Sequence, residues 1–374
     1  MAPTQKRRPT VERPKRIWKG DDRDVVLLCN PQAGGRWKEL ADILDSEEAG
    51  LARRIVTDSI EDVGPALSNL TRKTQLVCIY GGDGTIQHII DKICENPKSY
   101  CPHLAFIGGG TMNVTARWCG LTRSAGKNFR EIVRAYKSGQ LLLKEVPLLK
   151  VQQDENVNWG FTFGLGPPIR LLNEYENGTK GKAAALRLVA KSMAAVWTEF
   201  PADFQPLLQE MEAEILMDGQ KLPYEKFIAV FCNVTGRINR AVEPFVKQRA
   251  RDTFYCAAYA VNRRELALAF PLLIRGRIPL DPKALLQSVS AWKKVVMSHL
   301  GKDSFPADPR YVNETAKTFE VRSKEKLYTV DGEILQSSGE SISVSLGPEL
   351  KLAVAPTVDL GRTMRLAANV TRPS

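Results

Sequence analysis

Apolar residues in the first third of the chain form short runs that alternate with segments of helical spacing. Four runs are typical of buried strands, at 24–30, 53–58, 75–80 and 104–110. Helical patterns follow them at 36–45, 61–70, from residue 86, from about Asn113, and at 127–139. After residue 86, isoleucines at i, i+3, i+4 and i+7 share one helix face. This βαβα order predicts a parallel, three-layer α/β domain.

The pattern changes after about residue 143. Strand and hairpin patterns dominate, at 221–234, 252–261, 317–334 and 340–355. Two helical segments interrupt them, at 181–200 and 263–276. We expect a loop at 164–169, GLGPPI, because this stretch begins like a dinucleotide-binding fingerprint but lacks its third glycine. The second half therefore predicts an all-β domain with helical insertions.

The length of 374 residues, with 43% hydrophobic residues, is enough for two hydrophobic cores. We expect a basic disordered tail over 1–21, an α/β domain over 22–143 and the β-rich domain over 144–356. The last segment, 357–374, is expected to be able to pack back on the first domain.

Positive charge is concentrated at the start of the chain. Residues 1–20 hold seven lysines and arginines and one glutamate, so +6 of the net charge of +11 lies there. Such a segment is either a solubilising tail or a tether to anionic lipid, where each basic residue contributes about 1 kcal/mol. The rest of the chain has no nucleic-acid-binding motif, so we expect no nucleic-acid partner.

The seven cysteines are scattered and never form a CxxC pair, which indicates reduced core thiols. The sequence shows neither a secretory signal pattern nor an apolar run of about 20 residues, which predicts a cytoplasmic protein. With three histidines and no HExxH motif, a zinc site is not expected. Any metal should bind to oxygen ligands.

Three glycine-marked turns follow strands of the first domain: NPQAGG (30–35), GGDGT (81–85) and GGGTMN (108–113). In an open parallel sheet, ligands bind outside the carboxyl ends of the strands. Backbone N–H groups that no side chain covers can meet phosphate oxygens there. The acid in this setting, Asp83, would repel phosphate unless it held Mg²⁺ or took a proton from an attacking hydroxyl. The combination predicts phosphoryl transfer, without the motif of a P-loop protein or a protein kinase.

These turns, in this order and followed by Val330-Asp331-Gly332-Glu333, resemble the diacylglycerol kinase catalytic-domain superfamily. The resemblance is strongest to soluble bacterial-type lipid kinases and weaker to sphingosine and ceramide kinases, and it covers about residues 22–356. GGDGT alone also occurs in NAD kinases and phosphofructokinases. The resemblance implies an α/β nucleotide-binding domain followed by a β-sandwich, with ATP and Mg²⁺ in the cleft between them.

The resemblance also implies an ATP-dependent lipid kinase. Its acceptor would be the hydroxyl of a lipid such as diacylglycerol or a sphingoid lipid. Peripheral contact with a membrane is then expected, and a homodimer is left open.

Site residues follow from the resemblance, position by position. The family's nucleotide-phosphate residues match Asn30, Gly81, Gly82, Gly84, Thr85, Gly110, Thr111 and Asn113, and Thr57 matches a position that often contacts nucleotide. The family's acids match Asp83, Asp331 and Glu333, which we expect to be catalytic, with Asp83 and Asp331 toward Mg²⁺. The general base is left open between Asp83 and Glu333.

Some positions depart from the family pattern. Gly108 and Val114 stand where proline and aspartate are usual, and the segment after 231–245 lacks the usual glycine-rich pattern, keeping only Asp252. We therefore do not predict the family's second, structural metal site and leave its existence open. By itself, Asp331-Gly332 indicates a type I′ hairpin turn, which is compatible with a role for its acid.

Two other functions remain open. One is an NAD kinase-like enzyme of the same superfold, and the other is a catalytically silent protein that binds lipid or nucleotide.

Overall fold

The protein is seen here in a computed structural model. It describes residues 24–31, 37–57, 59, 61–68, 70, 73–95, 102–110, 113–178, 182–198, 200, 202–236, 243–281, 307–339 and 341–354. The described residues up to Leu148 and from Gly347 onward form unit 1, and Leu149–Leu346 form unit 2. The expected basic tail, the segment 357–374 and Thr111 lie outside the described residues.

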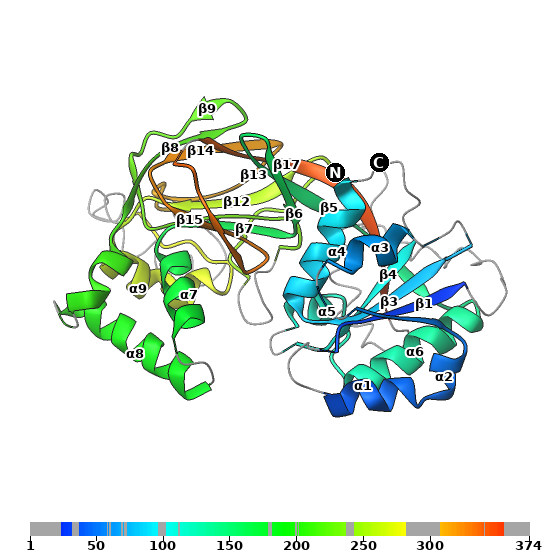
Figure 1. The fold of residues 1–374 in the computed structure, drawn as a ribbon. Helices are drawn as coiled ribbons and strands as arrows, with labels where there is room; N and C mark the ends of the chain where they lie inside the picture. The colour runs from blue at the N-terminus through cyan, green and yellow to red at the C-terminus, as the bar shows by residue number, and fades with distance from the viewer. Residues whose placement is uncertain are drawn as a thin grey trace, which may run out of the picture. The chain divides into compact units, whose positions relative to one another are not determined.

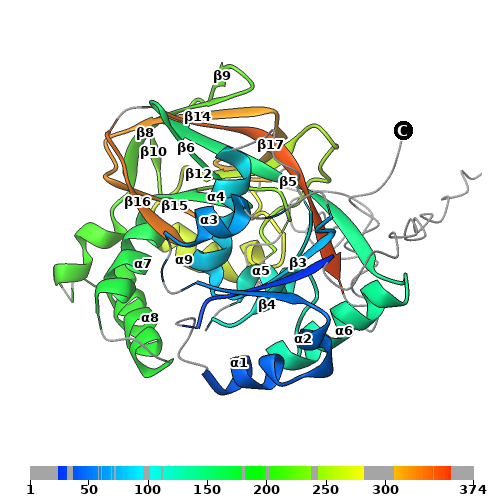
Figure 2. The same ribbon diagram turned by 45° about the vertical axis from the view of Figure 1, so that its right-hand side comes forward.

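Unit 1 is a parallel sheet with helices on both faces (Figure 1). The strands run in the order β17-β4-β3-β1-β2. Their bounds are β1 Val25–Cys29, β2 Arg53–Val56, β3 Leu76–Gly81, β4 His103–Gly108 and, at the end of the chain, β17 Ser341–Val354. The helices are α1 Trp37–Leu44, α2 Glu47–Gly50, α3 Val63–Ser68, α4 Asp83–Glu95, α5 Val114–Trp118 and α6 Ala125–Lys137. Figure 2 shows α3 and α4 on one face of this sheet, with α1, α2 and α6 on the other.

The core of unit 1 follows from its apolar pattern. Every residue of β1 and β3 is buried, as expected for central strands covered on both faces. In α4 the predicted isoleucine face is confirmed for Ile86, Ile89 and Ile90, which are at most 1% exposed, whereas Ile93 is only half-buried. The predicted three-layer α/β domain is therefore confirmed.

Unit 2 is built on two antiparallel sheets, seen as layers in Figure 1. One has the order β13-β12-β11-β7-β15-β16, and the other joins β10, β8, β14 and the first part of β17, with β9 beside β8. β5 runs out of unit 1 and pairs with β6. The bounds are β5 Leu142–Gln153, β6 Asn156–Gly160, β7 Thr162–Leu165, β8 Met211–Met217, β9 Gln220–Lys221, β10 Lys226–Phe227, β11 Ala229–Asn233, β12 Phe254–Tyr259, β13 Tyr311–Ala316, β14 Thr318–Ser323, β15 Leu327–Val330 and β16 Glu333–Gln336. The predicted β-rich second domain is confirmed.

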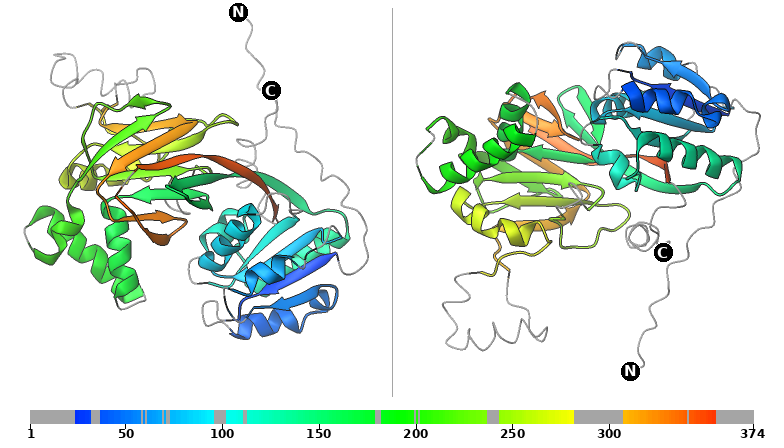
Figure 3. Two further views of the ribbon diagram at one scale, coloured as in Figure 1. Left: turned by 45° about the horizontal axis from the view of Figure 1, so that its top comes forward. Right: turned by 90° about the horizontal axis from the view of Figure 1, so that it is seen from below.

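Helices interrupt the strands of unit 2. They are α7 Pro167–Asn177, α8 Lys182–Trp197 and α9 Arg263–Leu273, with 3₁₀ turns at Ala202–Phe204 and Pro206–Leu208. Figure 3 shows the green helices α7 and α8 projecting from the sheets of this unit. None of the helices within the described residues is long and apolar enough to cross a bilayer.

The expected loop at 164–169 is wrong. Residues up to Leu165 belong to β7, Gly166 turns the chain with φ 96°, and α7 starts at Pro167. Leu165 is 1% exposed and pairs with both Val230 and Tyr328. Proline suits the first helical position because its φ is preset and its missing N–H is not needed there. A strand-to-helix junction therefore replaces the expected loop.

Candidate functional site

The three glycine-marked turns begin at the same edge of the sheet in unit 1. In the strand register Cys29 lies opposite Tyr80, and Gly81 lies opposite Gly108. Backbone hydrogen bonds extend this alignment past the strand ends, from Asn30 N–H to the Tyr80 carbonyl (2.9 Å) and from Gly109 N–H to the Gly81 carbonyl (2.8 Å). This is the carboxyl edge of the sheet, where ligands of open α/β folds bind.

The first turn is tied to the second by side chains. The Asn30 amide donates a hydrogen bond of 2.9 Å to the Thr85 hydroxyl oxygen, over 55 positions of sequence. Thr85 lies in the first turn of α4, so the bond fixes Asn30 against the start of that helix. Both side chains are partly exposed, and the Thr85 hydroxyl keeps its proton to donate to a ligand.

Most glycines at this edge make room for neighbouring protein atoms. A Cβ on Gly81 would lie 2.7 Å from Thr85 Cβ, and a Cβ on Gly108 would lie 2.6 Å from Asn113 Cγ. A Cβ on Gly110 would approach Gly82 Cα to 2.8 Å. These distances are shorter than side chains tolerate, so close packing of the turns against one another explains these glycines.

Gly82 is different. A Cβ built there meets only Gly110 Cα within 4 Å, at an ordinary contact distance of 3.6 Å. The fold therefore does not require glycine at this position. Gly82 immediately precedes α4, whose first N–H groups have no partner within the helix. An uncovered backbone at a helix start suits a phosphate group.

The third turn is closed by Asn113. Its side chain accepts a hydrogen bond from Gly110 N–H and donates one to the Gly110 carbonyl, both at 2.7 Å. Its backbone is left-handed, with φ 49°, a conformation that asparagine adopts more readily than most residues. Asn113 thus shapes the turn that carries Gly110, and its predicted nucleotide contact stays a prediction.

Asp83 is the first residue of α4 and is partly exposed. Its Oδ1 accepts a hydrogen bond of 3.3 Å from the N–H of Thr115, in the first turn of α5. The carboxylate therefore joins the helices that follow the second and third turns. Its oxygens are suitable ligands for Mg²⁺, which proteins bind through one or two carboxylates together with substrate phosphates.

Thr57 follows β2 at the same edge of the sheet. Its hydroxyl donates to the Cys29 carbonyl at 3.1 Å, and the residue is 2% exposed. This bond joins the ends of β1 and β2. The observed contact is structural, and the predicted contact with nucleotide stays a prediction.

The other two acids lie in unit 2. Asp331 and Gly332 both have positive φ, at 51° and 96°, between β15 and β16, as the predicted I′ hairpin turn requires. Glu333 begins β16 and is exposed. The expectation that these acids share a cleft with Asp83 stays a prediction.

The Asp331 carboxylate is held by backbone donors. Thr162 N–H donates to its Oδ1 at 2.8 Å, and Phe161 N–H lies 2.9 Å from Oδ2. A Cβ on Gly160 would lie 2.5 Å from Val330 Cγ1 and 2.8 Å from the same Oδ2, so glycine there makes room for both side chains. These contacts give Asp331 a structural task at the β6–β7 junction, and its predicted Mg²⁺ contact stays a prediction.

The sequence analysis missed Asn233, which supports this junction. Asn233 is fully buried and donates to the Thr162 hydroxyl oxygen at 2.8 Å. Its Oδ1 accepts the N–H groups of Thr235 and Gly236, at 2.7 and 2.6 Å. The available signal in the sequence was a polar residue at the end of an apolar strand, two positions before Thr235-Gly236.

A polar cavity of about 240 Å³ in unit 1 was also missed. It is lined by Gly108 and Asn113 of the third turn and by Arg117 and Arg123. Arg123 is paired with Glu131, whereas Arg117 is exposed at the end of α5. The two arginines around Gly120 were the signal in the sequence, and they add positive charge next to the third turn.

A search of the described residues finds no cluster of three or more His, Cys, Asp or Glu side chains placed to hold a metal. A fully protein-made metal cage is therefore not seen in this part of the chain. Asp83 with substrate phosphates would satisfy the oxygen preference of Mg²⁺ without one.

Part of the chain is similar to a known kinase domain. Residues 24–141 match the family model of the diacylglycerol kinase catalytic domain, which supports a kinase. A solved structure of a diacylglycerol kinase from Bacillus anthracis str. Sterne is 17% identical, covers 89% of this chain and 97% of that chain, and has a TM-score of 0.53. Two other structures from that organism are 18% and 19% identical, each over 89% of this chain and 98% of that chain, with a TM-score of 0.56.

These identities show a shared fold, which spans both units. No curated protein matches the chain significantly. The match over residues 24–141 supports a kinase related to the diacylglycerol kinase catalytic-domain superfamily.

Proposed function

We propose that this protein is an ATP- and Mg²⁺-dependent lipid kinase that phosphorylates the hydroxyl of a lipid such as diacylglycerol or a sphingoid lipid. The observation that carries the proposal is the uncovered backbone of Gly82 at the start of α4, where the three turns of a kinase-family domain meet. The N–H groups at the start of α4 and the Thr85 hydroxyl can donate hydrogen bonds to the phosphates of ATP.

In the proposed reaction, a carboxylate takes the proton of the lipid hydroxyl. The hydroxyl oxygen forms a bond to the γ-phosphorus, and the bond from that phosphorus to the bridging oxygen of ADP breaks, so ADP leaves. Asp83 is our first candidate for the base because it stands beside Gly82, and Glu333 is the second. When bound, Mg²⁺ would offset the negative charge of the β- and γ-phosphates.

Positioning and charge stabilisation supply most of the catalysis in phosphoryl transfer. The bonds from Asn30 to Thr85 and from Gly109 to Gly81 hold the turns before ATP arrives. A preformed site of this kind loses little free energy to rearrangement in the transition state.

The test is transfer from γ-labelled Mg-ATP to micellar diacylglycerol, monoacylglycerol, sphingosine, ceramide and phosphatidylglycerol, with NAD as a soluble acceptor. Asp83→Asn and Glu333→Gln are measured in parallel. We expect label in one lipid class and loss of at least about 100-fold in the variant that lacks the base, as is usual for general-base catalysis.

Label in NAD alone would replace the proposal with an NAD kinase-like function. ATP binding without transfer to any acceptor would indicate a silent binding protein and would also overturn it.

A further inference from the structure

Helix α9 carries apolar residues on two faces. Ala269 and Leu273 are at most 5% exposed and pack in a core cluster with Tyr259 and Tyr311. On the outside, Leu268 is 69% exposed and Leu272 is 39% exposed. A helix that only covers a core needs one apolar face, so the second face calls for a partner.

Arginines flank the outer apolar residues. At 3.6 residues per turn, Leu268 and Leu272 follow one another along the helix, and the exposed Arg275 and Arg277 come after its end. We call these four residues the basic-apolar face. Arg264, at the start of the helix, donates instead to the Val196 carbonyl at 3.3 Å. Residues 263–278 hold four arginines against a single glutamate.

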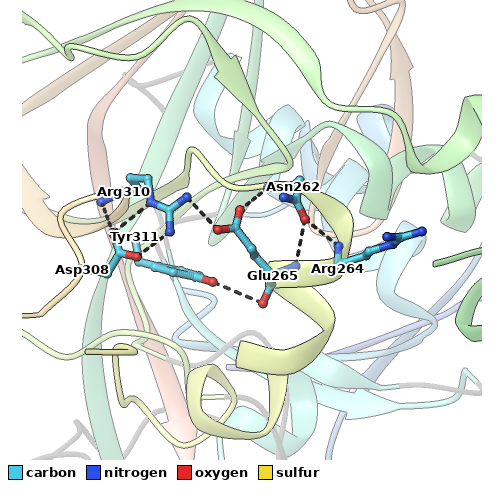
Figure 4. A network of polar contacts seen from close by, with 6 residues as sticks. All are labelled: Asn262, Arg264, Glu265, Asp308, Arg310 and Tyr311. Atoms are coloured by element: carbon cyan, nitrogen blue, oxygen red, sulfur yellow. Dashed lines mark hydrogen bonds and ion pairs between the residues drawn. The ribbon is translucent and has the colours of Figure 1, made fainter. Parts of the chain in front are cut away.

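That glutamate is already paired with an arginine from outside the helix. Glu265 accepts a hydrogen bond of 2.7 Å from Arg310, which also pairs with the buried Asp308 at 2.8 Å. Figure 4 shows Arg264 pointing away from this network. Glu265 is therefore engaged by Arg310, and the arginines of residues 263–278 outnumber it four to one.

The helix is fixed firmly enough to present this face. Asn262 and Glu265 form a reciprocal capping box, with three bonds of 3.0 Å, and the Tyr311 hydroxyl donates to the Glu265 carbonyl at 3.2 Å (Figure 4). At the other end, Glu243 N–H donates to the Ile274 carbonyl at 3.0 Å. Because both ends of α9 are anchored, Leu268 and Leu272 stay on its exposed side.

We propose that the basic-apolar face of α9 docks on an anionic lipid bilayer, with the leucines entering the interface and the arginines meeting lipid phosphates. Apolar side chains rimmed by arginine are what an amphipathic helix needs to lie in an anionic interface. This proposal concerns binding alone and does not depend on the proposed kinase activity.

The experiment is flotation of the full chain with vesicles, without ATP or substrate. Vesicles are phosphatidylcholine alone or phosphatidylcholine with phosphatidylglycerol. Leu268→Ser/Leu272→Ser removes the apolar part, and Arg275→Glu/Arg277→Glu reverses two charges. Matched controls are Val56→Ser/Val246→Ser, at other exposed apolar positions, and Lys324→Glu/Lys326→Glu, at exposed lysines of the same unit.

We expect the wild type to prefer the anionic vesicles. The leucine variant should bind at least about fivefold more weakly, and the arginine variant at least about tenfold, since each basic residue contributes about 1 kcal/mol at such a surface. Both controls should change binding by less than about twofold.

Failure of the wild type to float, or unchanged binding of both α9 variants, would overturn the proposal. A wild-type dimer in solution that the leucine variant turns into a monomer would assign the face to a second copy of the chain, and would also overturn it.

Discussion

The Asn30 side chain donates a 2.9 Å hydrogen bond to Thr85, which links the turn after β1 to the first turn of α4. The two residues are 55 positions apart, and each stands at the carboxyl end of the sheet of unit 1. The bond orients a hydroxyl that can still donate its proton to a phosphate.

Replacing Thr85 tests this link. Thr85→Val keeps the packing against Gly81 but removes the acceptor, so ATP affinity should fall about tenfold, corresponding to about 1.4 kcal/mol. Thr85→Ser keeps the hydroxyl and should lose less than about threefold. Isothermal titration calorimetry with ATP measures both, and equal affinities for valine and serine variants would refute the role of the hydroxyl.

Replacing Gly82 tests whether glycine at this position is needed for ligand binding and not for folding. Gly82→Ala should change the free energy of unfolding by less than about 1 kcal/mol, because its Cβ would meet only ordinary contacts. It should nevertheless weaken ATP binding at least about tenfold by covering the backbone that meets phosphate.

The matched control is Gly64→Ala in α3, where a Cβ meets nothing within 4 Å and alanine favours the helix. This variant should keep full ATP affinity. Urea unfolding and calorimetry measure the two effects separately, and wild-type ATP affinity in Gly82→Ala would rule out this phosphate site.

The backbone donors around Asp331 lead to a third prediction. Asp331→Ala leaves two N–H groups without their acceptor and should lower the free energy of unfolding by about 1–3 kcal/mol. Asp331→Asn keeps one acceptor oxygen and should lose less. The control is Asp154→Ala, at an exposed hairpin turn with φ 53°, whose carboxylate accepts a hydrogen bond from the Ser338 hydroxyl.

Activity then distinguishes the two roles of Asp331. A purely structural carboxylate predicts that Asp331→Asn retains most of the transfer rate, whereas a Mg²⁺ ligand predicts a large loss and a higher Mg²⁺ requirement. Full stability of Asp331→Ala would show that the backbone contacts do not matter.

The described cysteines should be unreactive in the native protein. All six are buried, and burial raises the pKa of Cys29 and of Cys119 to about 12. The thiolate is the reactive form, so these thiols are almost fully protonated at pH 8. Iodoacetamide at pH 8, followed by peptide mass spectrometry, should label these cysteines in urea only. Rapid native labelling of Cys29 or Cys119 would contradict their burial.

The sequence predicted the α/β domain well because its signals are local. Continuous apolar runs become the central strands β1 and β3, and the isoleucine spacing of α4 sets its buried face. The sequence also predicted that the three turns begin at one edge of the sheet, because parallel strands place their carboxyl ends at the same edge.

The features that the sequence analysis missed depend on contacts between residues that are distant in sequence. The reason for Gly81 and Gly108 lies in the side chains of Thr85 and Asn113, so counting glycines overstated how many were open to a ligand. The same holds for Asn233, whose role depends on Thr162 in another strand. At 164–169 a motif comparison outweighed strand and proline signals, and the loop expected there was wrong.

The central claim is that the γ-phosphate of ATP passes to a lipid hydroxyl at the turns around Asp83. The most direct measurement compares wild type with Asp83→Asn for label transferred from ATP to extractable lipid, at ATP concentrations that saturate both proteins. The account predicts labelled lipid from the wild type and a rate at least about 100-fold lower in the variant. Equal rates, or no labelled lipid from a wild-type protein that binds ATP, would contradict it.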